Sequence, residues 1–298
     1  MIIKIIFQLK QVNINLNMNW LIYGHNGWIA RQFIKEIPDY INIVKGTERF
    51  ENFEKIKNEI LTIKPDHVVV LGGLTYKSPA TNIDWCEDHK QEVIRVNVLG
   101  MLNIADICEN NNIHCTILGT GCIYSSINDK EYTEEDMWDF QESFYSKTKA
   151  YTQELLKCYK NVLLLRIRMP INNSNDSKNF ISKLKKFEKI ISIKNSMTVL
   201  PELIPVMIKL IELNKTGTWN IVNPGVISHK EIMDMYNIKK KYIDISHQSE
   251  LTRVARSNNH LCVDKLMSFV NEYNNTHDDK LIVNEIHDAI KLIQNYSS

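Results

Sequence analysis

The stretch Asn19-Trp-Leu-Ile-Tyr23-Gly24-His-Asn-Gly27-Trp-Ile-Ala30 decides the fold. Its first five residues form a largely apolar run, and residues 28–35 have helical spacing, which together predict a strand, a tight turn and a helix. Glycines at positions 24 and 27 fit a turn in which backbone N–H groups at the helix start receive a pyrophosphate. Ala30 stands at the third glycine position of that motif, and a purely structural glycine turn is the alternative interpretation.

The alternation of strands and helices continues to residue 167. We expect strands at 41–44, 67–71, 115–118 and 162–167, and helices at 50–63, 92–110 and 144–159. Strands that alternate with helices at this spacing form a parallel sheet covered by helices on both faces. The predicted fold class is therefore α/β, a Rossmann doubly wound parallel sheet. Right-handed crossovers place the carboxyl ends of its strands along one edge, where ligands bind.

Three regions are expected along the chain. Residues 1–17 are interpreted as an N-terminal extension, with Met18 as an alternative start to Met1. Residues 18–169 form the nucleotide-binding Rossmann domain, and residues 170–298 form a smaller C-terminal substrate-binding lobe, part of which returns to the Rossmann sheet. The rhythm changes at this boundary to a polar loop, and we then expect helices at 180–189, 199–213 and 229–236 and a strand at 218–222.

Composition narrows the classes of function. The 298 residues carry a net charge of +1, which disfavours a broad nucleic-acid or anionic-membrane surface. The sequence has no run of about 18 apolar residues, so no transmembrane helix is predicted. The six cysteines form no CxxC pair and have no Cys/His ligand spacing, so we expect no metal site and free thiols in a reducing, cytoplasmic compartment.

Two short motifs carry candidate chemistry. Thr120-Gly-Cys122 follows the strand at 115–118, and Tyr145 and Lys149 are four residues apart on the helix at 144–159. Residues at this spacing share a helix face, so the ammonium can lower the phenol pKa and the phenol can pass a proton to a carbonyl oxygen. The Thr120 hydroxyl can reach the same oxygen. The combination predicts a carbonyl reductase, although YxxxK also occurs by chance on amphipathic helices.

The segment after the second strand bears on the cofactor. A NAD site usually places an acidic residue there for the ribose hydroxyls, whereas Lys45 and Arg49 would meet a ribose phosphate. NADPH is therefore predicted, with NADH as the alternative if Glu48 holds the ribose. The predicted cofactor-binding residues are Gly24, Asn26, Gly27, Trp28, Ile29, Arg49, Gly72, Asn97, Tyr145 and Lys149.

The glycine turn, the strand-end Thr120 and the YxxxK motif together resemble the extended short-chain dehydrogenase/reductase family. Its nucleotide-sugar 4,6-dehydratases carry Thr-Asp-Glu where this chain has Thr120-Gly-Cys122, and the cysteine is similar to that of GDP-fucose synthase. Longer strings resemble the bifunctional UDP-4-keto-6-deoxyglucose 3,5-epimerase/4-reductases of rhamnose synthesis. These strings are 82–90, 95–98, 120–123, 143–150, 166–170, 179–183, 195–198, 223–226 and 256–259.

The resemblance implies roles for individual residues. Cys122 would be the base that removes hydrogens next to a ketone, if neighbouring cations stabilise its thiolate. Lys183 matches the family's acid by position, although it lies in a run of lysines that would equally suit a solvated helix face. Tyr145 would donate the proton during reduction, supported by Lys149 and Thr120. Asp84, Trp85, Asn179 and Arg256 are predicted to bind substrate, with a surface ion pair as the alternative for Arg256 and core packing for Trp85.

The sequence thus predicts an enzyme that converts UDP-4-keto-6-deoxyglucose, or its dTDP analogue, to the β-L-rhamnose nucleotide with NADPH. The upstream 4,6-dehydratase would be a separate partner, since the Asp-Glu pair is missing here. One alternative is a dTDP-4-dehydrorhamnose reductase without epimerase activity. Another is a non-catalytic, reductase-like regulatory subunit. A homodimer formed by the helices at 92–110 and 144–159 is also expected from the resemblance.

Overall fold

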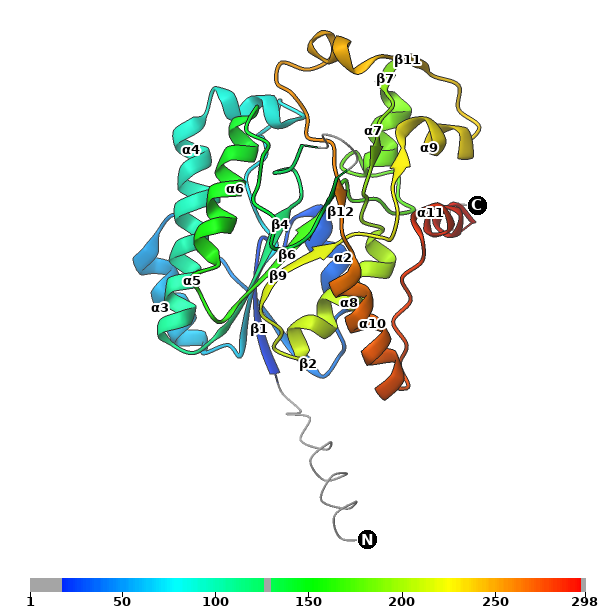
Figure 1. The fold of residues 1–298 in the computed structure, drawn as a ribbon. Coiled ribbons are helices and arrows are strands. Elements are labelled where there is room, and N and C mark those ends of the chain that lie inside the picture. The colour runs from blue at the N-terminus through cyan, green and yellow to red at the C-terminus, as the bar shows by residue number, and fades with distance from the viewer. Residues whose placement is uncertain (1–17, 126–129, 296–298) are drawn as a thin grey trace.

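A six-stranded parallel sheet is the centre of the protein (Figure 1). The computed structural model describes residues 18–125 and 130–295, so the predicted extension at residues 1–17 lies outside the described residues. The strand order is β2-β1-β3-β4-β6-β9, and each neighbouring pair is parallel. The strands are β1 (Met18–Tyr23), β2 (Ile41–Lys45), β3 (His67–Val70), β4 (His114–Thr120), β6 (Val162–Ile167) and β9 (Gly217–Ile221). The predicted Rossmann doubly wound sheet is confirmed.

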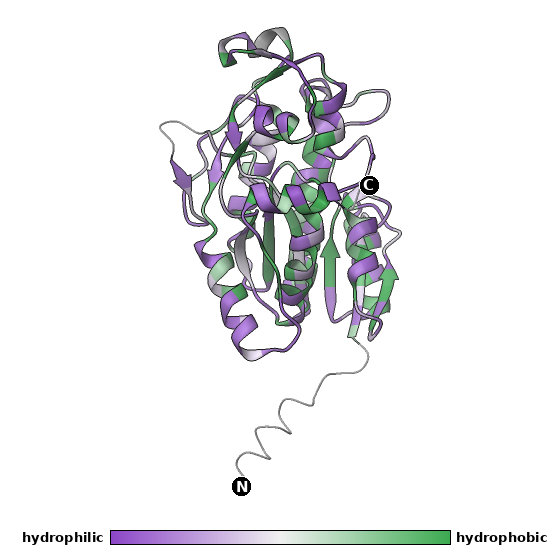
Figure 2. Ribbon diagram, turned by 90° about the vertical axis from the view of Figure 1, so that its right-hand side faces the viewer, coloured by the Kyte–Doolittle hydropathy of each residue, from purple (hydrophilic) through white to green (hydrophobic). Residues whose placement is uncertain are grey.

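Helices cover both faces of this sheet. One buried cluster joins the strands to α3 (Phe53–Ile63), α5 (Gly100–Asn110) and the end of α6 (Phe144–Leu156). The other joins them to α2 (Trp28–Glu36), α8 (Leu200–Glu212) and α10 (Asp264–Thr276). Figure 2 shows hydrophobic residues concentrated in the strands, while the helices carry hydrophilic residues as well. Burial of apolar side chains between these layers is the main favourable contribution to the stability of such a fold.

The predicted helix at 92–110 is one continuous element with an irregular middle. It begins as α4 (Lys90–Ile94), widens to a π-helical segment, η2 (Arg95–Leu99), and continues as α5. A π segment inserts an extra residue into a helix and often occurs at functional sites. Asn97, completely buried, lies in this segment.

The turn after β1 requires its glycine. Gly24 has a φ of +76°, and a Cβ atom there would lie 2.5 Å from the backbone nitrogen of Gly72. Glycine alone avoids both the strained backbone and the collision. The close approach brings the loop after β3 directly against the loop after β1.

The second half of the chain supplies β9, α8 and α10 to the Rossmann sheet and builds a separate cluster beside it. That cluster packs α7 (Phe180–Lys186), α9 (His229–Met235) and α11 (Ile286–Asn295) (Figure 1). Two pairs of short strands belong to this second half, namely β7 (Lys189–Ile191) with β11 (Lys241–Ile243) and β8 (Lys194–Asn195) with β10 (Ile227–Ser228). A third pair, β12 (His260–Leu261) with β5 (Glu131–Tyr132), reaches back to the first half. The expected helix at 180–189 ends at residue 186, because Lys189 already belongs to β7.

Candidate active site

A cleft of about 420 Å³ opens at the carboxyl ends of β1, β2 and β3. Between β1 and β3 the strand order reverses, which is where open α/β sheets bind ligands. Its lining includes the predicted residues Gly24, Asn26, Gly27, Arg49 and Gly72. No side chain caps the first turn of α2, so its backbone N–H groups, those of Trp28 and Ile29 among them, are available to an anion.

The charged residues predicted to distinguish NADPH from NADH do not all lie at the cleft. Glu48 and Arg49 line the cleft, whereas Lys45 is exposed on β2 and is not among the lining residues. Arg49 donates to Glu51 through Nε and Nη2, at 3.0 and 2.9 Å. This pair is exposed and therefore weak, so it does not prevent the guanidinium from turning to a phosphate.

Tyr145, Lys149 and Thr120 meet at the end of β4. The Ser143 side chain caps α6 by accepting from the backbone N–H of Ser146, which fixes the first turn where Tyr145 lies. The Thr120 side chain lies near the Tyr145 hydroxyl and acts to lower its pKa. Burial of that hydroxyl raises the pKa of Tyr145, with a further contribution from Cys122, so the phenol is a proton donor at neutral pH.

Lys149 is buried one turn further along the same helix. Burial lowers the pKa of Lys149 to about 8, although the nearby Cys122 opposes the shift. Its Nζ makes a long hydrogen bond of 3.5 Å to the backbone oxygen of Leu118. Lys149 is not among the groups that shift the pKa of Tyr145, so the expected lowering of the phenol pKa by the ammonium is not seen in this structure.

Asn97 anchors the loop after β3. Its side chain accepts from the backbone N–H of Leu74 at 2.7 Å and donates to the backbone oxygen of the same residue at 2.7 Å. Its own backbone oxygen accepts from Thr152 on α6 at 2.9 Å. Asn97 thus joins the π segment, the cofactor-side loop and the Tyr145 helix.

Cys122 has a partner that sequence reasoning missed. Arg168, which follows β6, donates from Nη1 to the Cys122 Sγ at 2.8 Å. Arg168 is 1% exposed, whereas Cys122 is partly exposed. The available signal was the string Arg166-Ile-Arg168 at the end of an otherwise apolar strand, since a charged side chain in a central strand needs a buried partner.

Lys183 differs from the other lysines of its run. It is partly buried on α7, while Lys185, Lys186 and Lys189 are exposed. Burial, together with the charge of Lys178, lowers the pKa of Lys183. A lysine with a lowered pKa gives up a proton more readily, which suits an acid in catalysis. The solvated-face interpretation therefore fits its neighbours and not Lys183.

A model of one protein family matches most of the chain, namely residues 18–256, and its description is RmlD substrate binding domain. The chain belongs to this family. The chain is 40% identical over 267 residues to the bifunctional dTDP-4-dehydrorhamnose 3,5-epimerase/dTDP-4-dehydrorhamnose reductase of Arabidopsis thaliana, covering 84% of this chain and 87% of that protein.

Another relative is longer than the present chain. The trifunctional UDP-glucose 4,6-dehydratase/UDP-4-keto-6-deoxy-D-glucose 3,5-epimerase/UDP-4-keto-L-rhamnose-reductase RHM1 of Arabidopsis thaliana is 40% identical over 266 residues. The match covers 84% of this chain and only 39% of that protein. Among solved structures, UDP-rhamnose synthase L780 of Acanthamoeba polyphaga mimivirus superposes with a TM-score of 0.86 at 35% identity, over 93% of this chain and 98% of that one.

The predicted substrate residues of this RmlD-family chain lie at two places. Asp84 and Trp85 are on η1 (Ile83–Glu87), and the Asp84 Oδ1 accepts from Arg256 Nη2 at 2.7 Å. The Trp85 ring stacks on His89 with centroids 3.9 Å apart. Asn179 is almost completely buried, caps α7 and donates to the backbone oxygens of the preceding loop, so it shapes that loop.

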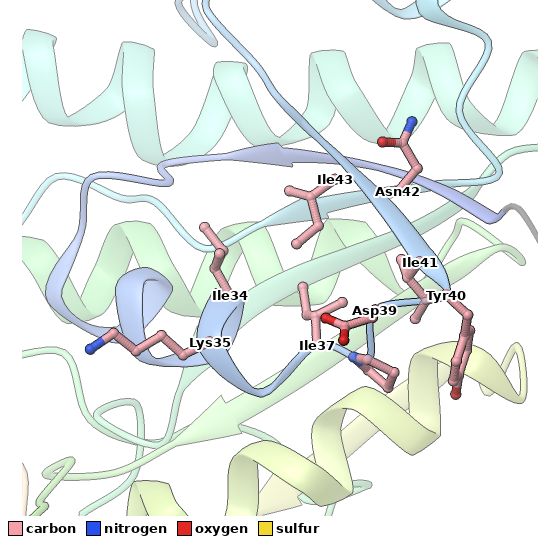
Figure 3. Close-up of a pocket in the computed structure, with 9 residues that line it drawn as sticks. Ile34, Lys35, Ile37, Asp39, Tyr40, Ile41, Asn42 and Ile43 are labelled. Atoms are coloured by element: carbon pink, nitrogen blue, oxygen red, sulfur yellow. The ribbon is translucent and has the colours of Figure 1, made fainter.

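A second hollow of this RmlD-family fold lies away from these residues. It measures about 380 Å³ and is lined by residues 34, 35 and 37–43, between the end of α2 and β2 (Figure 3). This is the amino edge of the sheet, opposite the edge where parallel α/β folds bind ligands. We assign no chemistry to it.

Residues 18–125 and 130–295 contain neither a metal-binding cluster nor a membrane-spanning helix. No group of three or more His, Cys, Asp or Glu side chains there could hold a metal ion. No helix in the same ranges is long and apolar enough to cross a membrane.

Proposed function

We propose that this chain converts UDP-4-keto-6-deoxy-D-glucose to UDP-β-L-rhamnose, by 3,5-epimerisation followed by NADPH-dependent reduction of the 4-keto group. The observation that carries the proposal is the meeting of Thr120, Tyr145 and Lys149 with Cys122 and Arg168 at the end of β4. The first three residues suit ketone reduction, and the other two suit proton removal beside the same ketone. The names of the bifunctional and trifunctional relatives support both reactions.

The residues of the cleft fit NADPH. The turn at Gly24 and Gly27, pressed against Gly72, leaves room for a pyrophosphate on the backbone N–H groups of α2, and Arg49 would hold the ribose phosphate. The chemistry that NADPH would supply there is a hydride for carbon 4 of the sugar. Tyr145 donates its hydroxyl proton to the ketone oxygen, Thr120 orients that oxygen, and the Lys149 ammonium stabilises the phenolate that forms.

Epimerisation uses groups on two sides of the sugar. The hydrogens on carbons 3 and 5 lie next to the ketone, so their removal yields an enolate whose charge Tyr145 stabilises through its hydroxyl. Cys122 would remove each proton, and Lys183 would return one to the opposite face. Cys122 lies at the end of β4, whereas Lys183 is on α7 in the neighbouring cluster. These separate positions support one residue as the base and the other as the acid.

Dehydration would require another protein. The dehydratase resemblance places an aspartate where this chain has Gly121, and a Cβ atom there would already lie 2.7 Å from the Cδ1 of Leu261. Leu261 is fully buried, packed with Tyr124 and Tyr132. An aspartate at position 121 would therefore require the Leu261 side chain to shift, and this chain has neither acid of the dehydratase pair, which supports a separate upstream 4,6-dehydratase.

The test supplies the 4-keto sugar and NADPH in heavy water and identifies the product by NMR. Deuterium at carbons 3 and 5 of a rhamnose product would support the proposal. Reduction without deuterium would favour the alternative of a reductase that lacks epimerase activity. Absence of NADPH oxidation with both UDP and dTDP substrates would reject an enzymatic role and favour the regulatory-subunit alternative.

A homodimer is part of the proposal. Ile94, Leu99, Tyr151 and Leu155 expose 39–50% of their surfaces on α4, η2 and α6, and the two helices pack against each other. An apolar surface of this kind marks an interaction site, and a second copy would cover it with the same helices. Leu99→Glu should produce a monomer by analytical ultracentrifugation. A wild-type monomer at high concentration would contradict the dimer.

A further inference from the structure

The surroundings of Arg168 are unusual for a buried guanidinium. Its Nη2 donates to the Asn195 Oδ1 at 2.6 Å and to the backbone oxygen of Ser257, and its Nη1 donates to Cys122. Its Nε is buried without a hydrogen-bond partner. Within the part of the chain that the structure describes, the acceptors of its side-chain hydrogen bonds are a sulfur, an amide oxygen and a peptide oxygen, with no carboxylate among them. The contacts of this buried cation are therefore two neutral oxygens and one sulfur.

A buried charge is costly unless an opposite charge accompanies it. Of the three acceptors around Arg168, amide and peptide oxygens cannot ionise, whereas a thiol can. The Cys122 sulfur is thus the group that can supply the missing negative charge. A guanidinium is also the cation that keeps its proton in such a site, since its pKa exceeds 12 in water.

Other titratable groups face this pair. Tyr145 and Lys149 on α6 both interact with Cys122, and Cys86 on η1 faces Tyr145. His229 on α9 is close enough to Arg168 to interact with it, and burial lowers the pKa of His229 to about 4. His229 and Tyr145 are therefore neutral near pH 7, which leaves the two cations Arg168 and Lys149 beside the sulfur.

The neighbouring structure holds the guanidinium in place. Asn195 is fixed in turn by Asn258, whose side-chain oxygen accepts from it at 3.0 Å. The Ser257 hydroxyl donates to the backbone oxygen of Tyr124 at 2.6 Å. The arginine stem passes close to Gly121, because a Cβ atom there would lie in van der Waals contact with the Arg168 Cδ, at 3.5 Å. The Cys122 contact is thus built from three separate segments of the chain.

We infer that Arg168 is the positioning residue of the epimerase base, and that it holds Cys122 as a thiolate in a buried guanidinium–thiolate pair. The catalytic consequence rests on the proposed function. The thiolate takes a proton from carbon 3 or 5, an S–H bond forms as the C–H bond breaks, and the electron pair passes into the enolate. Lys183 then protonates the opposite face of that carbon, and solvent returns the proton from the thiol to the lysine.

The experiment measures alkylation of Cys122 by iodoacetamide, read by peptide mass spectrometry, between pH 6 and pH 8. Cys158, exposed on the same chain, is the internal reference. An ordinary exposed thiol gains roughly tenfold in thiolate per pH unit below its pKa, so Cys158 should react tens of times faster at the higher pH. Cys122 should change less than about threefold, because it is already ionised.

Arg168→Gln should restore a steep pH dependence at Cys122 and slow its alkylation at pH 7 about tenfold or more, while Arg168→Lys should keep much of the flat profile. Circular dichroism and an unchanged Cys158 profile establish that the variants fold. If Arg168→Gln does not fold, the pH dependence of Cys122 alkylation in the wild type and in Arg168→Lys still tests the guanidinium–thiolate pair. The inference of a guanidinium–thiolate pair would be overturned by either of two results. One is wild-type Cys122 alkylation that depends on pH as steeply as that of Cys158, and the other is a flat Cys122 profile in folded Arg168→Gln.

This readout needs no substrate, so it separates the inference from the proposed function. If Cys122 alkylation depends little on pH but the product carries no deuterium at carbons 3 and 5, the epimerase activity is rejected and the guanidinium–thiolate pair is supported. Deuterium incorporation that survives in Arg168→Gln at the wild-type rate would reject the role of Arg168 and leave the epimerase standing.

Discussion

Replacing Lys149 with Met should stabilise the protein and abolish ketone reduction. Burial lowers the pKa of Lys149 from 10.5 to about 8. At about 1.36 kcal/mol per pKa unit, the buried ammonium costs the folded state about 3 kcal/mol wherever it is charged both folded and unfolded. Methionine keeps an unbranched stem of similar length, and the substitution removes the long 3.5 Å hydrogen bond from Nζ to the backbone oxygen of Leu118.

The sign of the pH dependence follows from the same pKa values. Below about pH 8 both states carry the charge, so the folded state bears the full cost. Between pH 8 and 10.5 the folded protein releases the proton first, so the stability of the wild type should rise with pH. The Met variant lacks this titration and should show no such rise from position 149.

Urea unfolding at about pH 7 and pH 9.5, without NADPH, measures both effects. Lys147→Met, a partly exposed change on the same helix, is the matched control and should alter stability little. NADPH oxidation with the 4-keto sugar should be lost in Lys149→Met and retained in Lys147→Met. A Lys149→Met protein that is less stable than the wild type at pH 7 would refute the reasoning.

Three further predictions concern the same edge of the sheet. Cys122→Ala should lose deuterium exchange at carbons 3 and 5, whereas Tyr145→Phe should abolish reduction and keep some exchange; wild-type exchange in Cys122→Ala would exclude it as the base. Gly24→Ala should weaken NADPH binding about tenfold or more, as measured by fluorescence titration, because position 24 has a φ of +76° and the added Cβ would collide with the backbone of Gly72. Unchanged affinity would contradict the role of this turn in binding. Arg49→Glu should raise the KM for NADPH about tenfold and leave that for NADH nearly unchanged; equal increases would remove Arg49 from the ribose phosphate.

The central sheet could be predicted because its signals are local. Each long strand is an apolar run, and the predicted covering helices repeat their apolar residues at helical spacing, so the alternation is visible without tertiary information. The covering helix α10 was not predicted. The two- and three-residue strands were missed, since β5, β7 and their partners pair across long stretches of sequence. Nothing in such a short segment distinguishes it from a loop.

The candidate site divides in the same way. Thr120, Tyr145 and Lys149 were predictable because strand end and helix spacing already place them together. Arg168 was not, because its importance lies in contacts with Cys122, Asn195 and Ser257 that only the folded chain brings about. For Lys183 the spacing of the lysine run was uninformative, and burial on α7 is what separates it from its neighbours.

The tight packing around Gly121 has a consequence for how enzymes of this fold exchange activities. A side chain at position 121 requires the Cδ1 atom of the buried Leu261 to shift, and a larger residue at 122 must share its space with Arg168. Substituting Asp and Glu at these two positions therefore introduces a steric clash and removes the sulfur beside the guanidinium in the same step. A change from one chemistry to the other therefore involves the position of the Leu261 side chain as well as the residues at positions 121 and 122.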